Sequence, residues 1–137
     1  WMSNLMMKFI KQHKMDQRVF MMGQIEDIRK AFENAIALLI SSDREGSPKV
    51  LYESLYCEVP VISTKVGVMD NFLPSSCVSE GEDSQFSELV GKWVGKNDEL
   101  MNTQKYLFKK VRNENILTIQ EKKVRETYQS LLSKASK

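Results

Sequence analysis

The sequence is poor in the residue types that build disulfide scaffolds and metal centres. It contains two cysteines, Cys57 and Cys77, and a single histidine, His13. Neither cysteine belongs to a CxxC pair, so we expect two free, buried thiols in a reducing cytosol. No DxD pair and no His/Cys cluster has the spacing of metal ligands, and we expect no metal and no cofactor. His13 lies in a basic, polar stretch, where we expect a surface residue.

Long apolar runs, a strong net charge and the common phosphate-binding motifs are also missing. No apolar run approaches the roughly 20 residues that a membrane-spanning helix needs. A formal net charge of +2 is too small to predict nucleic-acid binding. No GxGxxG or GxxxxGK motif is present, which leaves little support for an unrelated Rossmann-type nucleotide binder. We therefore expect a cytoplasmic protein that binds no nucleic acid.

Basic residues gather near the C-terminus. They predict a solvated helix face. The alternative is electrostatic attraction to an anionic membrane, which would make the protein a peripheral partner of the cytoplasmic membrane face. These residues are Lys122, Lys123, Arg125, Lys134 and Lys137.

Strand and helix patterns alternate along the chain. Its 137 residues, 42% hydrophobic and 28% charged, suit one soluble domain with its own core. Continuous apolar runs at 18–22, 35–40 and 59–63 are typical of buried strands, the second of them covered on both faces, and 77–78 suggest a short fourth strand. The intervening helical patterns then predict a parallel sheet with helices on both faces, an α/β domain of Rossmann type.

Each predicted helix carries its apolar residues on one face. The first would begin behind a Ser3 cap, the second near the acidic Glu26 and Asp27, and the third at Pro48, ending near Tyr56. The residues expected on the apolar faces of the helices are Leu5, Met6, Phe9, Ile10, Ile25, Ile28, Phe32, Ala35, Phe86, Leu89, Val90, Trp93, Val94, Leu100, Tyr106, Leu107, Val111, Val124, Tyr128, Leu131 and Leu132.

The junction between residues 35–40 and the helix at 48–56 is the predicted ligand site. In open parallel sheets, ligands bind at the carboxyl ends of the strands. Ser47 suits a helix cap and Pro48 the first helical position. The first turn leaves backbone N–H groups unpaired and the helix dipole is positive there, so the junction favours an anion. Gly46 lets the backbone approach a ligand closely.

Two carboxylates frame this junction. Glu45 precedes the helix, and Glu53 lies about one and a half turns into it. A carboxylate accepts paired hydrogen bonds, which suits vicinal hydroxyls of a sugar or a ribose on either side of a diphosphate. The alternative reading is a loop acid and a solvated helical acid. Two interpretations of Lys49 stay open: it neutralises a phosphate, or it is a helix lysine that faces the solvent.

The run EGSPKVLYE (residues 45–53), followed by CEVPVISTKVG (57–67), resembles the E-x7-E signature of the retaining glycosyltransferases of family 4, also called glycosyltransferase group 1. The similarity extends back to RVFMMG (18–23) and forward to the last predicted helix. It implies the GT-B fold, in which two Rossmann-like domains face each other across a cleft. Residues 1–137 would form the nucleotide-sugar-binding domain of such an enzyme.

The resemblance implies a role for each residue of the junction. Glu45 would be catalytic and contact hydroxyls of the donor sugar, Glu53 would bind the ribose, and Ile25 would border the base. The enzyme would transfer a sugar from a nucleoside-diphosphate sugar to a glycan, lipid-linked or other acceptor, without a metal and with retention of configuration. The backbone that would hold the sugar and the diphosphate belongs to Gly46, Ser47, Pro48, Lys49 and Val50.

The sequence departs from the family pattern at several positions. Glu58 replaces a glycine before the PVI strand, Gly67-Val68 replaces a GG pair, and Asn71 replaces a glutamate. The phosphate-binding Arg and Lys of the family follow the first strand of the domain, and nothing upstream of Arg18 fits them. We therefore expect the first β–α unit and the acceptor-binding domain to lie outside this chain, which alone would be inactive. The alternative function is a non-catalytic GT-B-like binding or scaffold module.

Overall fold

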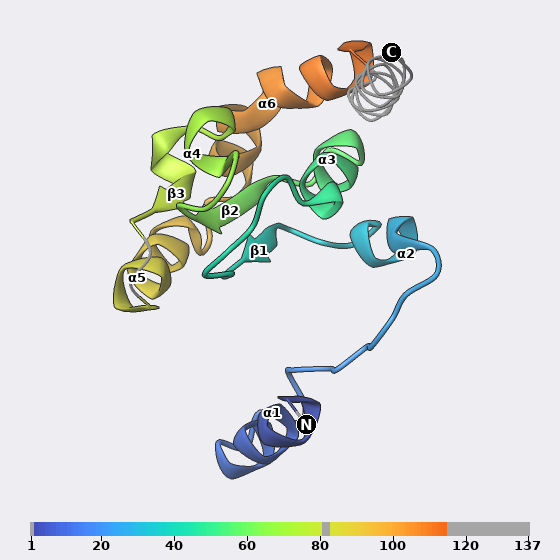
Figure 1. The fold of residues 1–137 in the computed structure, drawn as a ribbon, viewed down its shortest axis with the longest axis vertical. Helices are drawn as coiled ribbons and strands as arrows, with labels where there is room; N and C mark the ends of the chain where they lie inside the picture. Colours follow the sequence, from blue (N-terminus) through green and yellow to red (C-terminus); the bar gives the residue numbers. More distant parts are fainter. Residues whose placement is uncertain (1, 81–82, 115–137) are drawn as a thin grey trace, which may run out of the picture.

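Three parallel strands form the centre of the molecule in the computed structural model, which describes residues 2–80 and 83–114 (Figure 1). They lie in the order β1-β2-β3, with Leu38 of the first opposite Val61 of the second. This sheet confirms the predicted α/β class. The strands are β1 (Leu38–Ile40), β2 (Val61–Thr64) and β3 (Val78–Ser79).

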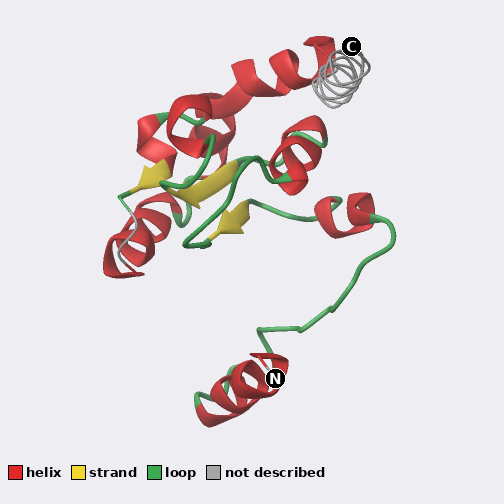
Figure 2. Cartoon of the chain, viewed as in Figure 1, coloured by secondary structure: helices red, strands yellow, loops and turns green. Residues whose placement is uncertain are grey.

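Helices lie on both sides of this sheet, as Figure 2 shows in red. The α3 and α6 helices pack against each other, and α5 packs against β2 and β3. The predicted covering of the sheet by helices on both faces is thereby confirmed. In chain order the helices are α1 (Met2–Gln12), α2 (Ile28–Phe32), α3 (Lys49–Tyr56), α4 (Met69–Phe72), the short 3-10 helix η1 (Ser75–Cys77), α5 (Asp83–Trp93) and α6 (Asn97–Glu114).

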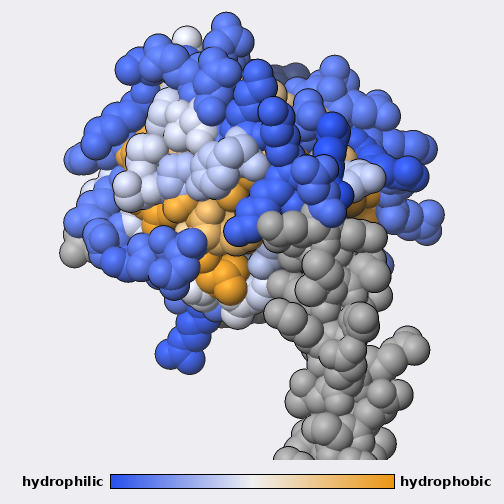
Figure 3. All heavy atoms as spheres, turned by 90° about the horizontal axis from the view of Figure 1, so that it is seen from above, coloured by the Kyte–Doolittle hydropathy of each residue, from blue (hydrophilic) through white to orange (hydrophobic). Residues whose placement is uncertain are grey.

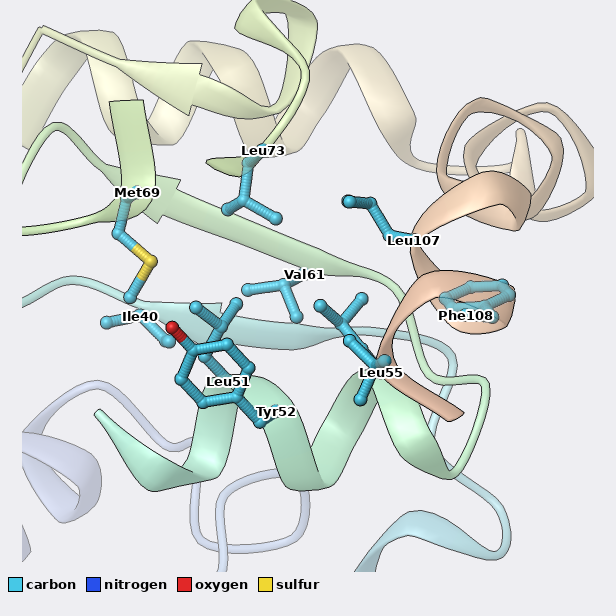
Figure 4. Close-up of a cluster of buried hydrophobic side chains, with 10 residues drawn as sticks. Ile40, Leu51, Tyr52, Leu55, Val61, Met69, Leu73, Leu107 and Phe108 are labelled. Carbon is cyan, nitrogen blue, oxygen red and sulfur yellow. The ribbon is translucent and has the colours of Figure 1, made fainter. Parts of the chain in front are cut away.

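Two apolar clusters fill the space between the sheet and the helices. Val61 and Ile62 are neighbours in β2 and point to opposite faces; Val61 belongs to the larger cluster and Ile62 to the smaller. In the larger cluster, Leu51 and Leu55 of α3 lie beside Val61 and Leu107 of α6 (Figure 4). Leu51 and Leu55 are fully buried, and burying such a side chain stabilises the fold by about 1.5–3 kcal/mol.

A glutamine side chain completes the hydrogen bonding of β2. Gln104 of α6 is fully buried. Its Oε1 accepts from the N–H of Val61 at 2.9 Å, and its Nε2 donates to the carbonyl of Val61 at 2.7 Å. Because β3 pairs with β2 only from Ser63 onward, the side-chain amide takes the place that an earlier β3 residue would have. A polar contact thereby adds to the apolar packing of α6.

The structure differs from the sequence prediction around β1. Residues 18–22 form no strand, and the apolar side chains from Val19 to Met22 are between 39% and 70% exposed. The β1 strand begins only at Leu38, and Leu39 is 48% exposed and Ile36 61%. The prediction that both faces of this strand are covered is therefore wrong. The reason is that α5 packs mainly against β2 and β3, which leaves the Leu39 face partly open.

The α1 helix lies apart from the sheet in Figure 1. It begins at Met2, so Ser3 lies inside the helix and the predicted Ser3 cap is wrong. Ile10 is buried, and the chain turns back beside it, where the N–H of Met15 donates to the carbonyl of Ile10 at 2.9 Å. The other residues expected on its apolar face stay about half exposed: Leu5, Met6 and Phe9.

The remaining helices follow the prediction with local differences. The α2 helix is short and begins after Asp27, whose carboxylate accepts from the N–H of Arg29 at 3.2 Å. Val94 lies beyond the end of α5 and is 74% exposed, and Tyr106 on the outer side of α6 is 56% exposed, so both core assignments are wrong. Buried as predicted are Phe32, Leu89, Leu100, Leu107 and Val111. Outside the described residues lie Val124, Tyr128, Leu131 and Leu132.

The two cysteines are free, and they differ in burial. Cys77 is buried, and this burial raises the pKa of its thiol. Cys57 is half-buried, so the prediction of two buried thiols holds for Cys77 alone. His13 is exposed, as predicted. The five basic residues of the predicted C-terminal face lie outside the described residues.

The surface of the molecule is largely hydrophilic on the side where α6 lies in Figure 1. Figure 3 shows this side, with hydrophilic side chains surrounding a smaller apolar area. In the described part of the chain, no helix combines the length and apolarity that crossing a membrane requires.

Candidate functional site

The loop between β1 and α3 lies at the carboxyl edge of the sheet, and the neighbouring strand holds it there. Thr64, the buried last residue of β2, donates its hydroxyl to the carbonyl of Ser42 at 2.7 Å. Further along, the N–H of Val68 donates to the carbonyl of Gly46 at 3.1 Å. The loop that carries the predicted site is therefore fixed at both ends by β2 and the turn after it.

Gly67 brings the turn after β2 into backbone contact with this loop. Its φ is 53°, in the left-handed region that favours glycine. A Cβ placed on Gly67 would lie 2.5 Å from the carbonyl oxygen of Glu45 and would also collide with the carbonyl oxygen of Gly46. Gly46 itself has open space beside it, because a Cβ there would meet no atom within 4 Å. The loop is thus closed toward β2 and open on the side of Gly46.

Glu45 is exposed in this loop and is oriented by one hydrogen bond. The hydroxyl of Ser42 donates to Oε1 of Glu45 at 2.9 Å. Among the described residues, the second carboxylate oxygen has no hydrogen-bond donor, so it is available to a hydroxyl group of a ligand.

The start of α3 provides backbone N–H groups next to Glu45. The helix begins at Lys49 with Pro48 as its cap residue, at φ −67° and ψ 128°. The predicted cap at Ser47 is therefore wrong by one residue, because Pro48 is still extended and no side chain of a described residue caps α3. The hydroxyl of Ser47 instead lies 3.1 Å from the hydroxyl of Tyr52. The uncapped first turn favours an anionic ligand.

The other predicted site residues lie around this helix. Glu53 is half-buried in α3, and Lys49 is exposed at its first turn. Ile25 is half-buried in the segment before α2, and α2 packs against α3. Six of the predicted residues, Glu45 to Val50, thus form one continuous segment at the helix start. Glu53 lies about one turn further along the same helix, and Ile25 lies in the segment before α2.

A further lysine lies at the same edge of the sheet. Lys65 directly follows β2, and its Nζ is 3.2 Å from both carboxylate oxygens of Glu80 and 3.6 Å from Asp70. Hydrogen bonding to Glu80 and the charge of Asp70 raise the pKa of Lys65. This cation is therefore already paired. Among residues 2–80 and 83–114, no three His, Cys, Asp or Glu side chains lie together as metal ligands would.

Two residues of this site, Ser42 and Thr64, and one contact, that of Gly67, were not predicted from the sequence. Ser42 lies three positions before Glu45, a spacing at which a serine hydroxyl reaches a nearby loop residue, so a local signal existed. Thr64 acts on a residue 22 positions earlier, for which the sequence gives no local signal. The contact of Gly67 with Glu45 and Gly46 also depends on the tertiary fold.

The parallel sheet, the helices on both of its faces and the helix start at its carboxyl edge define a Rossmann-like domain of the kind that makes up one half of a GT-B fold. The chain belongs to the group 1 glycosyl transferases, whose family model matches residues 3–110.

A solved structure supports the same fold. The chain is similar to sucrose-phosphate synthase from Thermosynechococcus elongatus, with a TM-score of 0.73 and 18% sequence identity. The match covers 91% of this chain and 34% of that protein, so the chain spans about a third of its length. Comparison with curated protein sequences gives no match. The predicted resemblance to the group 1 glycosyltransferases is thereby confirmed.

Proposed function

We propose that this chain is the donor-binding domain of a retaining, metal-independent glycosyltransferase of the hexosyltransferase type. The observation that carries this proposal is the uncapped start of α3 at Lys49, in the same segment as Glu45 and its oriented carboxylate. Membership of the group 1 glycosyl transferases supports transfer of a glycosyl group. The ligand would be a nucleoside-diphosphate sugar.

The geometry supports a division of the donor among the site residues. The diphosphate would lie on the N–H groups of the first turn of α3, where a negative charge gains about 0.3–1 kcal/mol, and up to about 2 when partly buried. Glu45 would accept hydrogen bonds from the sugar, and Glu53 from the ribose. Lys49 would neutralise part of the phosphate charge, and Ile25 would border the base.

Electrostatic stabilisation of the leaving diphosphate would be the main contribution of this domain to catalysis. Helix N–H groups and protein cations would supply it, with no metal ion. Lys65 contributes little in the present arrangement because Glu80 and Asp70 already pair with it. The acceptor, a glycan or a lipid-linked molecule, would bind a further domain, so we expect the 137-residue chain alone to be inactive.

A non-catalytic GT-B-like module is the second candidate. Asn71, which stands where the family has a glutamate, is exposed in α4, and the pairing of Lys65 removes one cation from the carboxyl edge. Such a module would be a binding or scaffold domain, cytoplasmic or at the cytoplasmic face of a membrane.

The proposal is tested by titrating the 137-residue chain with UDP, GDP and ADP, and with the nucleoside-diphosphate glucose or mannose of each base. We expect one nucleotide series to bind by calorimetry, and the sugar-bearing form to bind more tightly than the bare diphosphate. Absence of binding in every series, with a chain shown to be folded by circular dichroism, would contradict the proposed function.

Two substitutions test the division of roles. Glu53→Ala should weaken the binding of the bare diphosphate and of the nucleotide sugar about tenfold, because each ligand loses a hydrogen bond to a carboxylate. Glu45→Ala should weaken only the binding of the nucleotide sugar. Glu33→Ala, at an exposed position after α2, is the control. Equal losses for the bare diphosphate in the two site variants would refute the division.

A further inference from the structure

Glu45 is a flexible side chain at an exposed position, and one contact restricts it. Ordering a flexible glutamate side chain has an entropic cost, which a ligand must overcome if the free side chain is mobile. The hydroxyl of Ser42 donates to Oε1 of Glu45 at 2.9 Å. A carboxylate offers about four acceptor positions, so this bond fixes the direction of the group and leaves Oε2 for a ligand.

Ser42 is itself held in place by the neighbouring strand. Thr64 donates its hydroxyl to the carbonyl of Ser42 at 2.7 Å. Thr64 is 6% exposed and belongs to the fully buried strand β2. The orientation of an exposed carboxylate is therefore connected, through two hydrogen bonds, to a buried strand at the centre of the sheet.

We propose that Ser42 and Thr64 are positioning residues that orient Glu45 toward the sugar part of the donor. This inference rests on the proposed function, in which Glu45 accepts hydrogen bonds from sugar hydroxyls. Preorganisation of Oε2 lowers the ordering cost of sugar binding. It has no effect on the nucleoside diphosphate, which binds at the helix start and at Glu53. Ser42 and Thr64 thus act on recognition of the sugar alone.

A purely structural role for the two hydroxyls makes a different prediction. If Ser42 and Thr64 merely stabilise the loop, their removal should weaken the bare diphosphate and the nucleotide sugar alike, because both bind the same loop and helix start. The ratio of the two affinities therefore distinguishes positioning from stabilisation.

The experiment compares four variants and one control of the 137-residue chain, titrated with the diphosphate and the nucleotide sugar that the unmodified chain binds. Ser42→Ala and Thr64→Val each remove a hydroxyl, and Ser42→Thr and Thr64→Ser keep one. Ser41→Ala, at the exposed neighbouring position, is the control. We expect Ser42→Ala and Thr64→Val to weaken the nucleotide sugar by about three- to tenfold and to leave the bare diphosphate within twofold.

The conservative variants Ser42→Thr and Thr64→Ser should restore most of the lost affinity, and thermal melts show whether each variant is folded. Equal weakening of both ligands, or no change in either, would overturn the positioning role while leaving the donor site intact. If the unmodified chain binds neither ligand, the proposed function fails, and this inference fails with it.

Discussion

Glu58 adopts a backbone conformation that glycine usually takes. Its φ is 60°, directly after the cap residue of α3. The N–H of Glu58 donates to the carbonyl of Leu55 at 3.1 Å, and that of Val59 to Ser54 at 2.9 Å, which is the Schellman pattern that ends many helices. A left-handed conformation costs a residue with a Cβ about 1–2 kcal/mol. The side chain offsets part of this cost through an ion pair with Arg112, 2.7 Å between Nη1 and Oε1.

Replacing Glu58 by glycine should therefore stabilise the protein. The ion pair with Arg112 is half exposed on both sides and contributes at most about 1 kcal/mol, less than the strain of the left-handed conformation. We expect Glu58→Gly to raise the free energy of unfolding by about 0.5 kcal/mol, measured by urea denaturation. Glu58→Ala keeps the strain and loses the ion pair, so it should be less stable than the unmodified chain. A glycine variant less stable than the alanine variant would show that the strain is negligible.

At the scale of elements, the carboxyl edge of the sheet depends on the close approach of two loops. The turn after β2 contacts the loop after β1 through Gly67, and the N–H of Val68 bonds to Gly46. The same two loops hold the candidate donor site and the carboxylate of Glu45. Any group that separates the loops should therefore affect both stability and binding.

Gly67→Ala tests this close approach. A Cβ would collide with the backbone of Glu45 and Gly46, and overpacking of this kind costs about 1–3 kcal/mol in addition to the left-handed strain of about 1 kcal/mol. We expect a loss of about 2–4 kcal/mol in the free energy of unfolding and weaker binding of the nucleotide sugar. Gly95→Ala is a matched control, because Gly95 also has a positive φ, of 75°, but a Cβ there meets no atom within 4 Å. Similar losses in the two variants would exclude a steric role for Gly67.

The sequence predicted those elements whose signals are local. The α3 helix ends at Tyr56 as expected, and β2 (Val61–Thr64) overlaps the predicted run at 59–63, because apolar periodicity and proline position are properties of short segments. Burial around β1 was not predictable, since it depends on where α5 packs. The bond between Thr64 and Ser42 and the bonds between Gln104 and Val61 join residues 22 and 43 positions apart. Such contacts follow from the tertiary fold and have no local signal.

The assignment of site residues has the same limit. Glu45 and the segment up to Val50 could be proposed because their types and spacing suit a helix start. The orientation of Glu45 by Ser42, and the displacement of the cap from Ser47 to Pro48, are visible only in the structure. The role of each residue toward a donor stays a prediction until the titrations are done.

At the scale of the whole molecule, the sheet has an open apolar area beside β1. A groove of about 350 Å³ lies beside β1, and both Ile36, 61% exposed, and Val94, 74% exposed, line it. Parallel sheets are usually covered on both faces, and exposed apolar surface promotes association. Charged side chains on this face of β1 should therefore reduce nonspecific association of the chain.

Adding charge to this groove should increase solubility. We expect the double variant Ile36→Lys and Val94→Lys to need more ammonium sulfate for precipitation and to bind less of a hydrophobic dye. Because both side chains are exposed, the free energy of unfolding should change by no more than about 0.5 kcal/mol. The double variant Asn34→Lys and Asn102→Lys adds the same charge at exposed polar positions. An equal gain in solubility from this control would attribute the effect to net charge.

Gln104 makes completion of the sheet depend on the order of synthesis. During synthesis a domain generally folds as a unit, and within this domain Gln104 follows Val61 by 43 residues. Until α6 has been made, the N–H and carbonyl of Val61 have water in place of the side-chain amide. A nascent chain that already contains β1, α3 and β2 therefore still has an unfinished central strand. The last element to be synthesised among those described is the one that completes it.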